Sequence, residues 1–297
     1  MTAAATDNTK GVSVVIPAFN ERDAIEATIS DVRAALVTAQ ATHPRSEILV
    51  VDDGSSDGTG ELAEAAGARV IRQPRNRGYG AALKAGFAEA LYDTVVITDA
   101  DGTYPSNAIP AMLERAGDYE MVVGARVGEN VAIPMVRRPA KWVLRQLASF
   151  LAGQAIPDLN SGLRVIDRKL EQRFEHLLPS GFSFTTTITL AALCNDRLVH
   201  YHPIEYYARI GESKIRATHA FDFLLLVLRT VVYFNPLKVF LPLGGIFFGI
   251  GFIKFIYDLF IGNLSETALL GFLGGALLWS VGLLSDQIAR VALSGRQ

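Results

Sequence analysis

The chain has a single cysteine, no clustered basic residues in its first part and no apolar segment at residues 1–10. Each of these features argues against one class of protein. The 297 residues contain one cysteine, Cys194, so an intramolecular disulfide and a zinc site of Cys/His spacing are not expected. Lys and Arg number 28 against 30 Asp and Glu, for a net charge of −2, and no basic cluster precedes Arg126. A nucleic-acid partner needs a clustered basic surface and is therefore not expected.

The distribution of apolar residues predicts a globular domain followed by a membrane segment. Residues 1–10 are polar and small, which predicts no signal peptide and a first domain that stays in the cytoplasm. Charges occur throughout the first part of the chain, whereas the part from Leu237 onward is nearly free of charge for long spans. We therefore expect a globular domain at residues 1–218, a connecting segment at 219–235 and a helical hairpin at 236–297.

Five short apolar runs rich in β-branched residues predict strands, at residues 12–16, 47–51, 68–71, 94–98 and 121–123. Helical patterns lie between them, at residues 23–39, 60–66, 80–91 and 106–115. This alternation predicts an α/β domain with a parallel sheet and helices on both of its faces. Ligands of such sheets bind at the carboxyl ends of the strands, where residues 17–21, 52–53 and 99–101 are expected.

Two carboxylates, those of Asp99 and Asp101, directly follow the apolar run at residues 94–98. Hard oxygen ligands suit Mg²⁺ or Mn²⁺, which complete their coordination shells with water and substrate phosphates. The pair therefore predicts a divalent metal that acts together with a nucleoside diphosphate. An acidic turn without a ligand is the alternative, because Asp, Gly and Thr are common in turns.

The glycine-containing segment at residues 77–84 begins like the dinucleotide-binding motif G-x-G-x-x-G. Leu83 stands in the place of the third glycine, so an NAD site is not expected. The segment predicts a glycine turn that opens a helix. The helix amides could face a phosphate, or the turn could simply lead into a packed helix.

Two long apolar stretches near the end of the chain predict a pair of membrane helices, at about residues 238–261 and 267–287. Residues 267–285 are nineteen uncharged residues in a row, about 28 Å as a helix, and residues 239–253 also lack charge. The loop at 262–266 has no Lys or Arg, whereas Arg229, Lys238, Arg290 and Arg296 flank the pair. The positive-inside rule then places both ends in the cytoplasm.

Three further features bear on this hairpin. Lys254 and Asp258 lie four residues apart, so they can pair on one helix face. Two G-x-x-x-G patterns, Gly245/Gly249 and Gly271/Gly275, permit close helix contact within the hairpin or between protomers of a homo-oligomer. Residues 221–234 are too short and too interrupted to span the bilayer and are expected to lie along the interface as an amphipathic helix. A buried hairpin of a soluble protein is the alternative.

The motifs together resemble family 2 of the inverting glycosyltransferases, in the polyprenyl-phosphate branch. That branch includes dolichyl-phosphate mannose synthase and bacterial undecaprenyl-phosphate glucosyltransferases. The likeness covers nearly the whole chain, and six segments carry it, at residues 14–21, 50–59, 76–80, 99–105, 161–164 and 209–214. It implies a GT-A fold, a Rossmann-like mixed and mostly parallel sheet, with a nucleoside diphosphate sugar as donor and Mg²⁺ or Mn²⁺ as cofactor.

The likeness also implies roles for individual residues. Base, ribose and other parts of the nucleotide sugar would be contacted by Pro17, Phe19, Glu21, Val51, Asp53 and Ala100. Asp99 and Asp101 would serve the sugar and the metal, and Arg209 and Lys214 would contact the donor phosphates.

The physical chemistry of the transfer agrees with these roles. Charge grows on the departing diphosphate, where a metal held by Asp101, with Arg209 and Lys214, stabilises it. A lipid phosphate is already largely anionic at pH 7, so its attack needs little help from a base. Arg126, with Arg137, Arg138 and Ser213, would position this acceptor. Asp158 is a candidate catalytic or sugar-orienting carboxylate, with capping of the next element as the alternative.

The expected enzyme is a metal-dependent inverting hexosyltransferase of the inner membrane. Residues 101–105 resemble bacterial members that use UDP-sugars, which favours UDP-glucose as donor, with GDP-mannose as the alternative. A processive polysaccharide synthase is disfavoured because the chain lacks the Q-x-x-R-W sequence of such enzymes. A non-catalytic membrane scaffold is the alternative from another class, and it gives no reason to keep two repelling carboxylates together.

Overall fold

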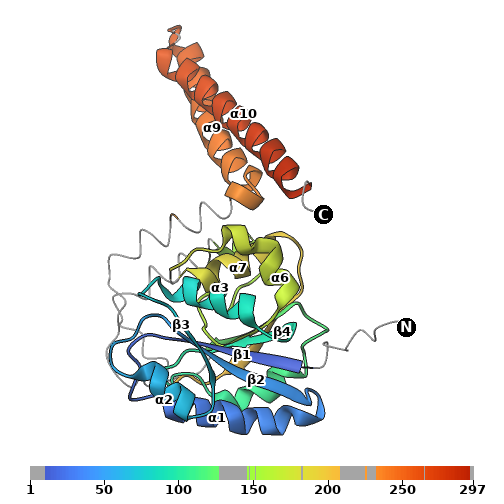
Figure 1. The fold of residues 1–297 in the computed structure, drawn as a ribbon. Coiled ribbons are helices and arrows are strands. Elements are labelled where there is room, and N and C mark those ends of the chain that lie inside the picture. The colour runs from blue at the N-terminus through green and yellow to red at the C-terminus, as the bar shows by residue number, and fades with distance from the viewer. Residues whose placement is uncertain are drawn as a thin grey trace, which may run out of the picture.

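The computed structural model describes residues 11–126, 146, 148–150, 152–181, 183–207, 225, 232–263 and 265–294. Within them the globular part is an α/β sandwich around one sheet, and an α-helical hairpin follows it (Figure 1). Of the expected interfacial segment at 219–235, only Leu225 and residues 232–235 are described. The prediction of an interfacial helix there stays a prediction.

Seven described strands form one mixed sheet in the order β3-β2-β1-β4-β6-β5-β7. The strands are β1 (Gly11–Ala18), β2 (Arg45–Asp52), β3 (Arg69–Arg72), β4 (Thr94–Ile97), β5 (Met121–Arg126), β6 (Arg164–Asp167) and β7 (Val199–Ile204). β6 runs antiparallel to both β4 and β5, and the other pairs are parallel. The predicted mixed, mostly parallel sheet is therefore confirmed, with the five predicted strands among the seven.

Helices cover both faces of the sheet because side chains along each strand alternate between the two faces. Along β1, Val12, Val14 and Ile16 pack on one side with α1 (Ile25–Thr38) and α4 (Ile109–Leu113). Val15 packs on the other side with α3 (Tyr79–Glu89), α6 (Arg168–Phe174) and α7 (Phe184–Cys194). The remaining described helices are short, namely α2 (Thr59–Ala65), η2 (Ala39–Ala41), η3 (Ser106–Ala108) and η5 (Glu175–Leu177).

The helical hairpin consists of α9 (Leu237–Ile261) and α10 (Glu266–Ser294). Both helices are long and apolar enough to cross a membrane, and most of each apolar window is exposed within this chain, unlike the core helix of a soluble domain. Gly251 and Gly271 meet backbone to backbone, so that a Cβ on Gly271 would lie 2.5 Å from the Cα of Gly251. The predicted close contact through glycine is thus present at Gly271, whereas Gly245 and Gly249 have no described atom in reach of a Cβ.

Described residues at and just before the start of α9 pack against the globular part. Phe234 packs edge-on against Phe174 of α6, with 5.8 Å between ring centroids. Val239, near the start of α9, packs against an apolar cluster that includes Leu190 and Leu193 of α7. At the far end of α9 the expected pair forms, with Lys254 donating to Asp258, which also accepts from the backbone amide of Ser265 at 2.9 Å. This carboxylate fastens the loop between the two helices.

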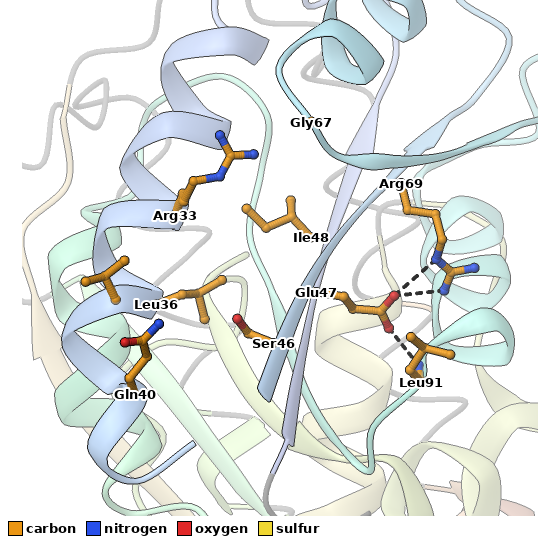
Figure 2. Close-up of a pocket in the computed structure, with 10 residues that line it drawn as sticks. Arg33, Leu36, Gln40, Ser46, Glu47, Ile48, Gly67, Arg69 and Leu91 are labelled. Carbon is orange, nitrogen blue, oxygen red and sulfur yellow. Dashed lines mark hydrogen bonds and ion pairs between the residues drawn. The ribbon is translucent and has the colours of Figure 1, made fainter. Parts of the chain in front are cut away.

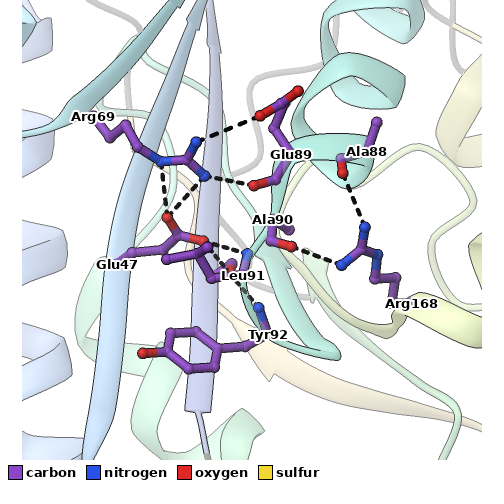
Figure 3. Close-up of polar contacts among 9 residues, drawn as sticks. Glu47, Arg69, Ala88, Glu89, Ala90, Leu91, Tyr92 and Arg168 are labelled. Atoms are coloured by element: carbon purple, nitrogen blue, oxygen red, sulfur yellow. Dashed lines mark hydrogen bonds and ion pairs between the residues drawn. The ribbon is translucent and has the colours of Figure 1, made fainter. Parts of the chain in front are cut away.

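A pocket lies at the amino end of β2. Arg33 and Leu36 of α1 line it from one side with Gln40 of η2, and Ser46, Glu47 and Ile48 of β2 line it from another (Figure 2). Beside it, Glu47 accepts from Arg69 and from the backbone amide of Leu91 (Figure 3). This pocket lies at the opposite end of β2 from Asp52, so it is remote from the edge where the acidic pair was predicted.

Candidate active site

The carboxyl ends of β1, β2 and β4 lie side by side, which brings the predicted site residues to one edge of the sheet. Ala18 pairs with Asp52 in the register of β1 with β2, and Val15 pairs with Ile97 in that of β1 with β4. The chain leaves these three strands toward the same side. Phe19–Glu21, Asp53 and Asp99–Asp101 therefore follow neighbouring strands, as predicted from the alternation of strands and helices.

The loop after β1 is hydrogen-bonded to the loop after β2. The Asn20 side chain accepts from the amide of Ser56 at 2.9 Å, and the Glu21 amide donates to the hydroxyl of Thr59 at 3.0 Å. Phe19 and Glu21 are half-buried, so part of each side chain is accessible. Pro17 is buried, and Val51 is completely buried in the core, so the contact of Val51 with a nucleotide stays a prediction.

Asp53 acts as a bracket for the turn that precedes α3. Its two carboxylate oxygens accept from the backbone amides of Arg77 and Gly78, both at 2.8 Å. The side chain is 3% exposed. In the structure this carboxylate holds protein backbone, and its contact with a nucleotide stays a prediction.

The start of α3 is covered by protein, which favours the packed turn over a phosphate site. The amide of Ala81, in the first turn, donates to the carbonyl of Ser180 at 3.0 Å. Gly78 has φ +99°, and a Cβ on Gly80 would lie 2.1 Å from the carbonyl oxygen of Pro179. The glycines are therefore required by the close approach of the turn at residues 179–181.

Asp99 is fixed from two sides. The hydroxyl of Tyr79 donates to Asp99 Oδ1 at 2.9 Å. Burial, and then the negative charge of Asp99, raise the pKa of Tyr79 well above its ordinary value, so the hydroxyl stays protonated and remains a donor. On the other side, a Cβ on Gly162 would lie 2.8 Å from the Asp99 carboxylate. Only glycine leaves room for this contact without a shift of the chain.

Asp101 is the second carboxylate of the pair. Its Oδ1 accepts from the backbone amide and the hydroxyl of Thr103, at 3.2 and 2.6 Å, and the residue is 6% exposed. Ala100, between the two acids, is buried, and its carbonyl accepts from Thr28 at 3.1 Å. The bonds from Thr103 and Thr28 therefore hold the loop that carries Asp99 and Asp101.

The donor set fits a hard divalent cation that shares its ligands with a substrate. Within the part of the chain that the structure describes, no group of three or more His, Cys, Asp or Glu side chains converges on a metal position. A dedicated protein cage is therefore not formed by these residues. Mg²⁺ commonly binds through one or two carboxylates plus substrate phosphates and water, which is what Asp99 and Asp101 can provide.

Arg126 and Asp158, predicted as separate site residues, form a partly buried ion pair. The Nε and one Nη of Arg126 donate to the two oxygens of Asp158 at 2.6 and 2.9 Å, and the Arg126 amide adds a bond at 3.1 Å. Burial favours the neutral form of Asp158, but the bonds from Arg126 outweigh this effect and lower the pKa of Asp158. The guanidinium also lies 5.1 Å from the ring centre of Tyr206.

Several predicted site residues lie outside the described residues. These are Arg137, Arg138, Arg209, Ser213 and Lys214. Their roles stay predictions.

Two residues of the site were not singled out from the sequence. Tyr79 stands between the two glycines of the 76–80 segment. Those glycines predict a turn or a phosphate contact, and neither prediction points to the tyrosine. Arg164 ends the 161–164 segment and is completely buried at the same edge of the sheet. An arginine directly after the glycine-containing segment at 161–163 was the available signal, although nothing local shows that it is buried.

The chain resembles known proteins both in sequence and in fold. The model of the family described as glycosyl transferase family 2 matches residues 13–174, and that of the GtrB C-terminal hairpin matches residues 235–291. The chain is 34% identical over 206 residues to a dolichyl-phosphate hexose transferase of Haloferax volcanii, covering 69% of this chain and 86% of the relative. It is 30% identical to an undecaprenyl-phosphate mannosyltransferase of Micrococcus luteus, covering 69% of this chain and 87% of that protein.

A further relative and a solved structure extend these findings. An undecaprenyl-phosphate 4-deoxy-4-formamido-L-arabinose transferase of Klebsiella pneumoniae is 30% identical over 82% of this chain and 74% of its own. Glucosyl-3-phosphoglycerate synthase from Mycobacterium tuberculosis, solved with Mn²⁺, UDP and phosphoglyceric acid, superimposes with a TM-score of 0.61. It is 21% identical and covers 75% of this chain and 78% of the solved one. At that identity the likeness shows the fold, which is the GT-A arrangement predicted from the motifs.

Proposed function

The chain belongs to glycosyl transferase family 2, and we propose that it transfers a hexose from a nucleoside diphosphate sugar to a membrane polyprenyl phosphate, with inversion at the anomeric carbon. One observation carries the proposal. The acidic pair and the Arg126–Asp158 pair lie at one edge of the sheet of a domain against which Val239, near the start of the apolar hairpin, packs. The names of the relatives, which include hexose and mannose transferases acting on lipid phosphates, support it.

The donor half of the proposed site is the edge formed by β1, β2 and β4. Phe19 and Glu21 would contact the nucleoside, and the backbone after Val51 would pass beside it. Asp99 and Asp101 would hold Mg²⁺ or Mn²⁺, which when bound neutralises charge on the departing diphosphate. Tyr79 keeps Asp99 oriented, because its hydroxyl donates to Oδ1. We propose UDP-glucose as the donor, on the likeness of residues 101–105 to UDP-sugar enzymes.

The acceptor half is centred on Arg126. A guanidinium has five N–H donors, and two of those of Arg126 point to Asp158 in the structure. The remaining donors would bind the lipid phosphate, with Asp158 fixing the orientation of the guanidinium. A phosphate oxygen then forms a bond to the anomeric carbon as the bond from that carbon to the nucleoside diphosphate breaks. The electron pair leaves with the diphosphate, and the acceptor requires no base because it is already an anion.

The proposed location is the inner membrane, with the globular domain and both ends of the hairpin in the cytoplasm. The hairpin at residues 236–297 would cross the bilayer twice, and the segment at 219–235 would lie along the interface next to the 1–218 domain. This placement brings the acceptor phosphate, at the level of the lipid headgroups, close to the domain that α9 joins.

A mannosyl donor is the second candidate, because one relative is named an undecaprenyl-phosphate mannosyltransferase. A donor screen decides between the two. The purified protein would be incubated with undecaprenyl phosphate and radiolabelled UDP-glucose or GDP-mannose, with Mg²⁺, with Mn²⁺ and with a chelator. Label in the organic phase with UDP-glucose alone, lost on chelation, is the expected result.

Each other outcome of this screen corrects one part of the proposal. Transfer from GDP-mannose alone replaces the donor and keeps the reaction. Label in a water-soluble polymer contradicts the lipid acceptor, and full transfer in the presence of the chelator contradicts the metal. Absence of turnover with every donor favours a non-catalytic scaffold.

A further inference from the structure

Arg164 is a completely buried cation at the carboxyl edge of the sheet. It is the first residue of β6, where it pairs with Ile97 at the end of β4 and with Val123 of β5. Among the fully buried side chains of the described residues it heads the order of size, and its exposure is 0%. It therefore stands between the strand that leads to the acidic pair and the strand that leads to Arg126.

All the hydrogen-bond partners that the structure gives Arg164 are uncharged. Its guanidinium donates to the carbonyl of Ser161 at 2.8 Å, to the carbonyl of Leu159 at 2.9 Å and to the hydroxyl of Thr189 on α7 at 2.5 Å. A fourth, weaker contact reaches the sulfur of Met121 at 3.6 Å. Burial lowers the pKa of Arg164, and the charge of Asp158, which acts on Arg164 without a hydrogen bond between them, partly offsets that effect. Burying a charge without a directly bonded ionic partner is costly, so a position like this is not explained by packing alone.

The two carbonyls belong to one turn, and that turn connects both halves of the site. Asp158 begins it and binds Arg126 through both carboxylate oxygens. Gly162 ends it, donates its amide to the hydroxyl of Tyr104 at 2.7 Å and lies against the Asp99 carboxylate. Arg164 holds the residues in between, because its planar fork reaches Leu159 and Ser161 at once.

We propose that Arg164 is a positioning residue, which sets the Asp158–Gly162 turn and thereby presents Asp158 to Arg126 in the orientation that lets Arg126 bind the acceptor. The inference rests on the proposed function, in which Arg126 contacts the lipid phosphate. Loss of the fork would let the turn shift and rotate the Arg126 guanidinium, while the loops after β1 and β2 keep their own contacts. Binding of the acceptor should therefore suffer more than binding of the donor.

Arg168 offers a matched control on the same segment of chain. It follows β6 at its other end and also donates to two backbone carbonyls, those of Ala90 at 2.6 Å and Ala88 at 2.9 Å (Figure 3). The chemistry is the same, but the carbonyls belong to the end of α3, at the amino edge of the sheet. A variant of Arg168 reports what the loss of such a clamp does to folding alone.

The experiment compares Arg164→Gln, Arg164→Lys and Arg168→Gln in the full-length protein, by transfer kinetics and thermal unfolding. Arg164→Gln should lower kcat/KM for undecaprenyl phosphate by about 10- to 100-fold, the range expected for a small misplacement of a binding group, with a smaller change in KM for the sugar nucleotide. Arg164→Lys should recover only part of the loss, because an ammonium cannot reproduce the fork. Arg168→Gln should lower Tm and leave the acceptor kinetics at the wild-type value.

A double-mutant cycle separates positioning from general stability. If Arg164 acts through Asp158, then Arg164→Lys should cause no further loss of acceptor kcat/KM in an Asp158→Asn background. An equal loss in both backgrounds, a loss confined to donor KM, or wild-type acceptor kinetics in both Arg164 variants would overturn the proposal. Should Arg164→Gln not fold, the lysine variant and the cycle decide.

Failure of the proposed function gives a different result. In that case the wild type itself transfers no sugar to the lipid phosphate. The positioning is then judged by unfolding: the Tm losses of Arg164→Lys and Asp158→Asn should be less than additive, and strictly additive losses would overturn it.

Discussion

Replacing Arg126 with methionine should destabilise the globular domain strongly, because it leaves the Asp158 carboxylate buried without its cation. The side chain of Asp158 is 10% exposed and receives two bonds from the guanidinium, with two more from the backbone amides of Arg126 and Asn160 that the variant would retain. Removing one partner of a buried ion pair typically costs about 3–5 kcal/mol. For a domain of roughly 200 residues, 1 kcal/mol corresponds to about 2–4 °C in Tm, so the expected loss is roughly 6–20 °C.

The reverse variant should cost less. Asp158→Asn leaves a cation whose side chain is 20% exposed and can turn toward water, and the amide oxygen can still accept one of its bonds. The double variant Arg126→Met/Asp158→Asn should be more stable than Arg126→Met alone, since no unpaired carboxylate remains. Calorimetric scans of the four proteins at one scan rate and pH 7 provide the measurement.

The pH dependence follows from the lowered pKa of Asp158. A carboxylate whose folded-state pKa is depressed adds stability above its unfolded pKa, near 3.9, and loses it as the pH falls through the folded value. The difference in Tm between the wild type and Arg126→Met should therefore narrow in acid. A Tm for Arg126→Met within about 2 °C of wild type at pH 7, below the 6 °C minimum derived from the cost of an unpaired charge, would refute the existence of the buried pair.

Three further predictions concern other groups. Tyr79→Phe should lower kcat by about 10- to 100-fold in radiolabel transfer assays, because a hydrogen bond to the charged Asp99 is worth about 1.5–3 kcal/mol; unchanged kcat would separate Tyr79 from the chemistry. Asp101→Asn should abolish metal-dependent transfer, with the exposed Asp31→Asn as control, and activity near wild type would remove Asp101 from the metal site. Burial raises the pKa of Glu171 to about 7, so stability should fall as the pH rises from about 4.5 to that value, and Glu171→Gln should flatten the curve of Tm against pH.

The central strands were predicted from short runs rich in β-branched and aliphatic residues. β1, β4 and the second half of β2 are buried on both faces, and strand segments of that kind are rich in β-branched and aliphatic residues. β7 was missed because its sequence, VHYHPI, mixes histidines and a proline with apolar residues at the edge of the sheet. An edge strand need not be apolar on both faces, so its pattern is weak.

The acidic pair could be predicted because its position depends on topology alone. Any residue that directly follows a central parallel strand reaches the same edge of the sheet, so Asp99 and Asp101 needed no further information. The pairing of Arg126 with Asp158 could not be predicted, because 32 residues separate them and only the antiparallel insertion of β6 between β4 and β5 brings them together. The bond from Tyr79 to Asp99 depends in the same way on tertiary structure.

The bracket formed by Asp53 has a consequence for any attempt to redesign the sugar nucleotide preference of this enzyme. A chemist who changes that acid to alter base recognition would first release the amides of Arg77 and Gly78, and with them the entry of the helix that carries Tyr79. A change in activity would then combine the effect on base recognition with the effect of the displaced helix, and the assay could not separate them. Libraries that keep Asp53 and vary the half-buried Phe19 and Glu21 would probe selectivity while Asp53 still holds the turn before α3.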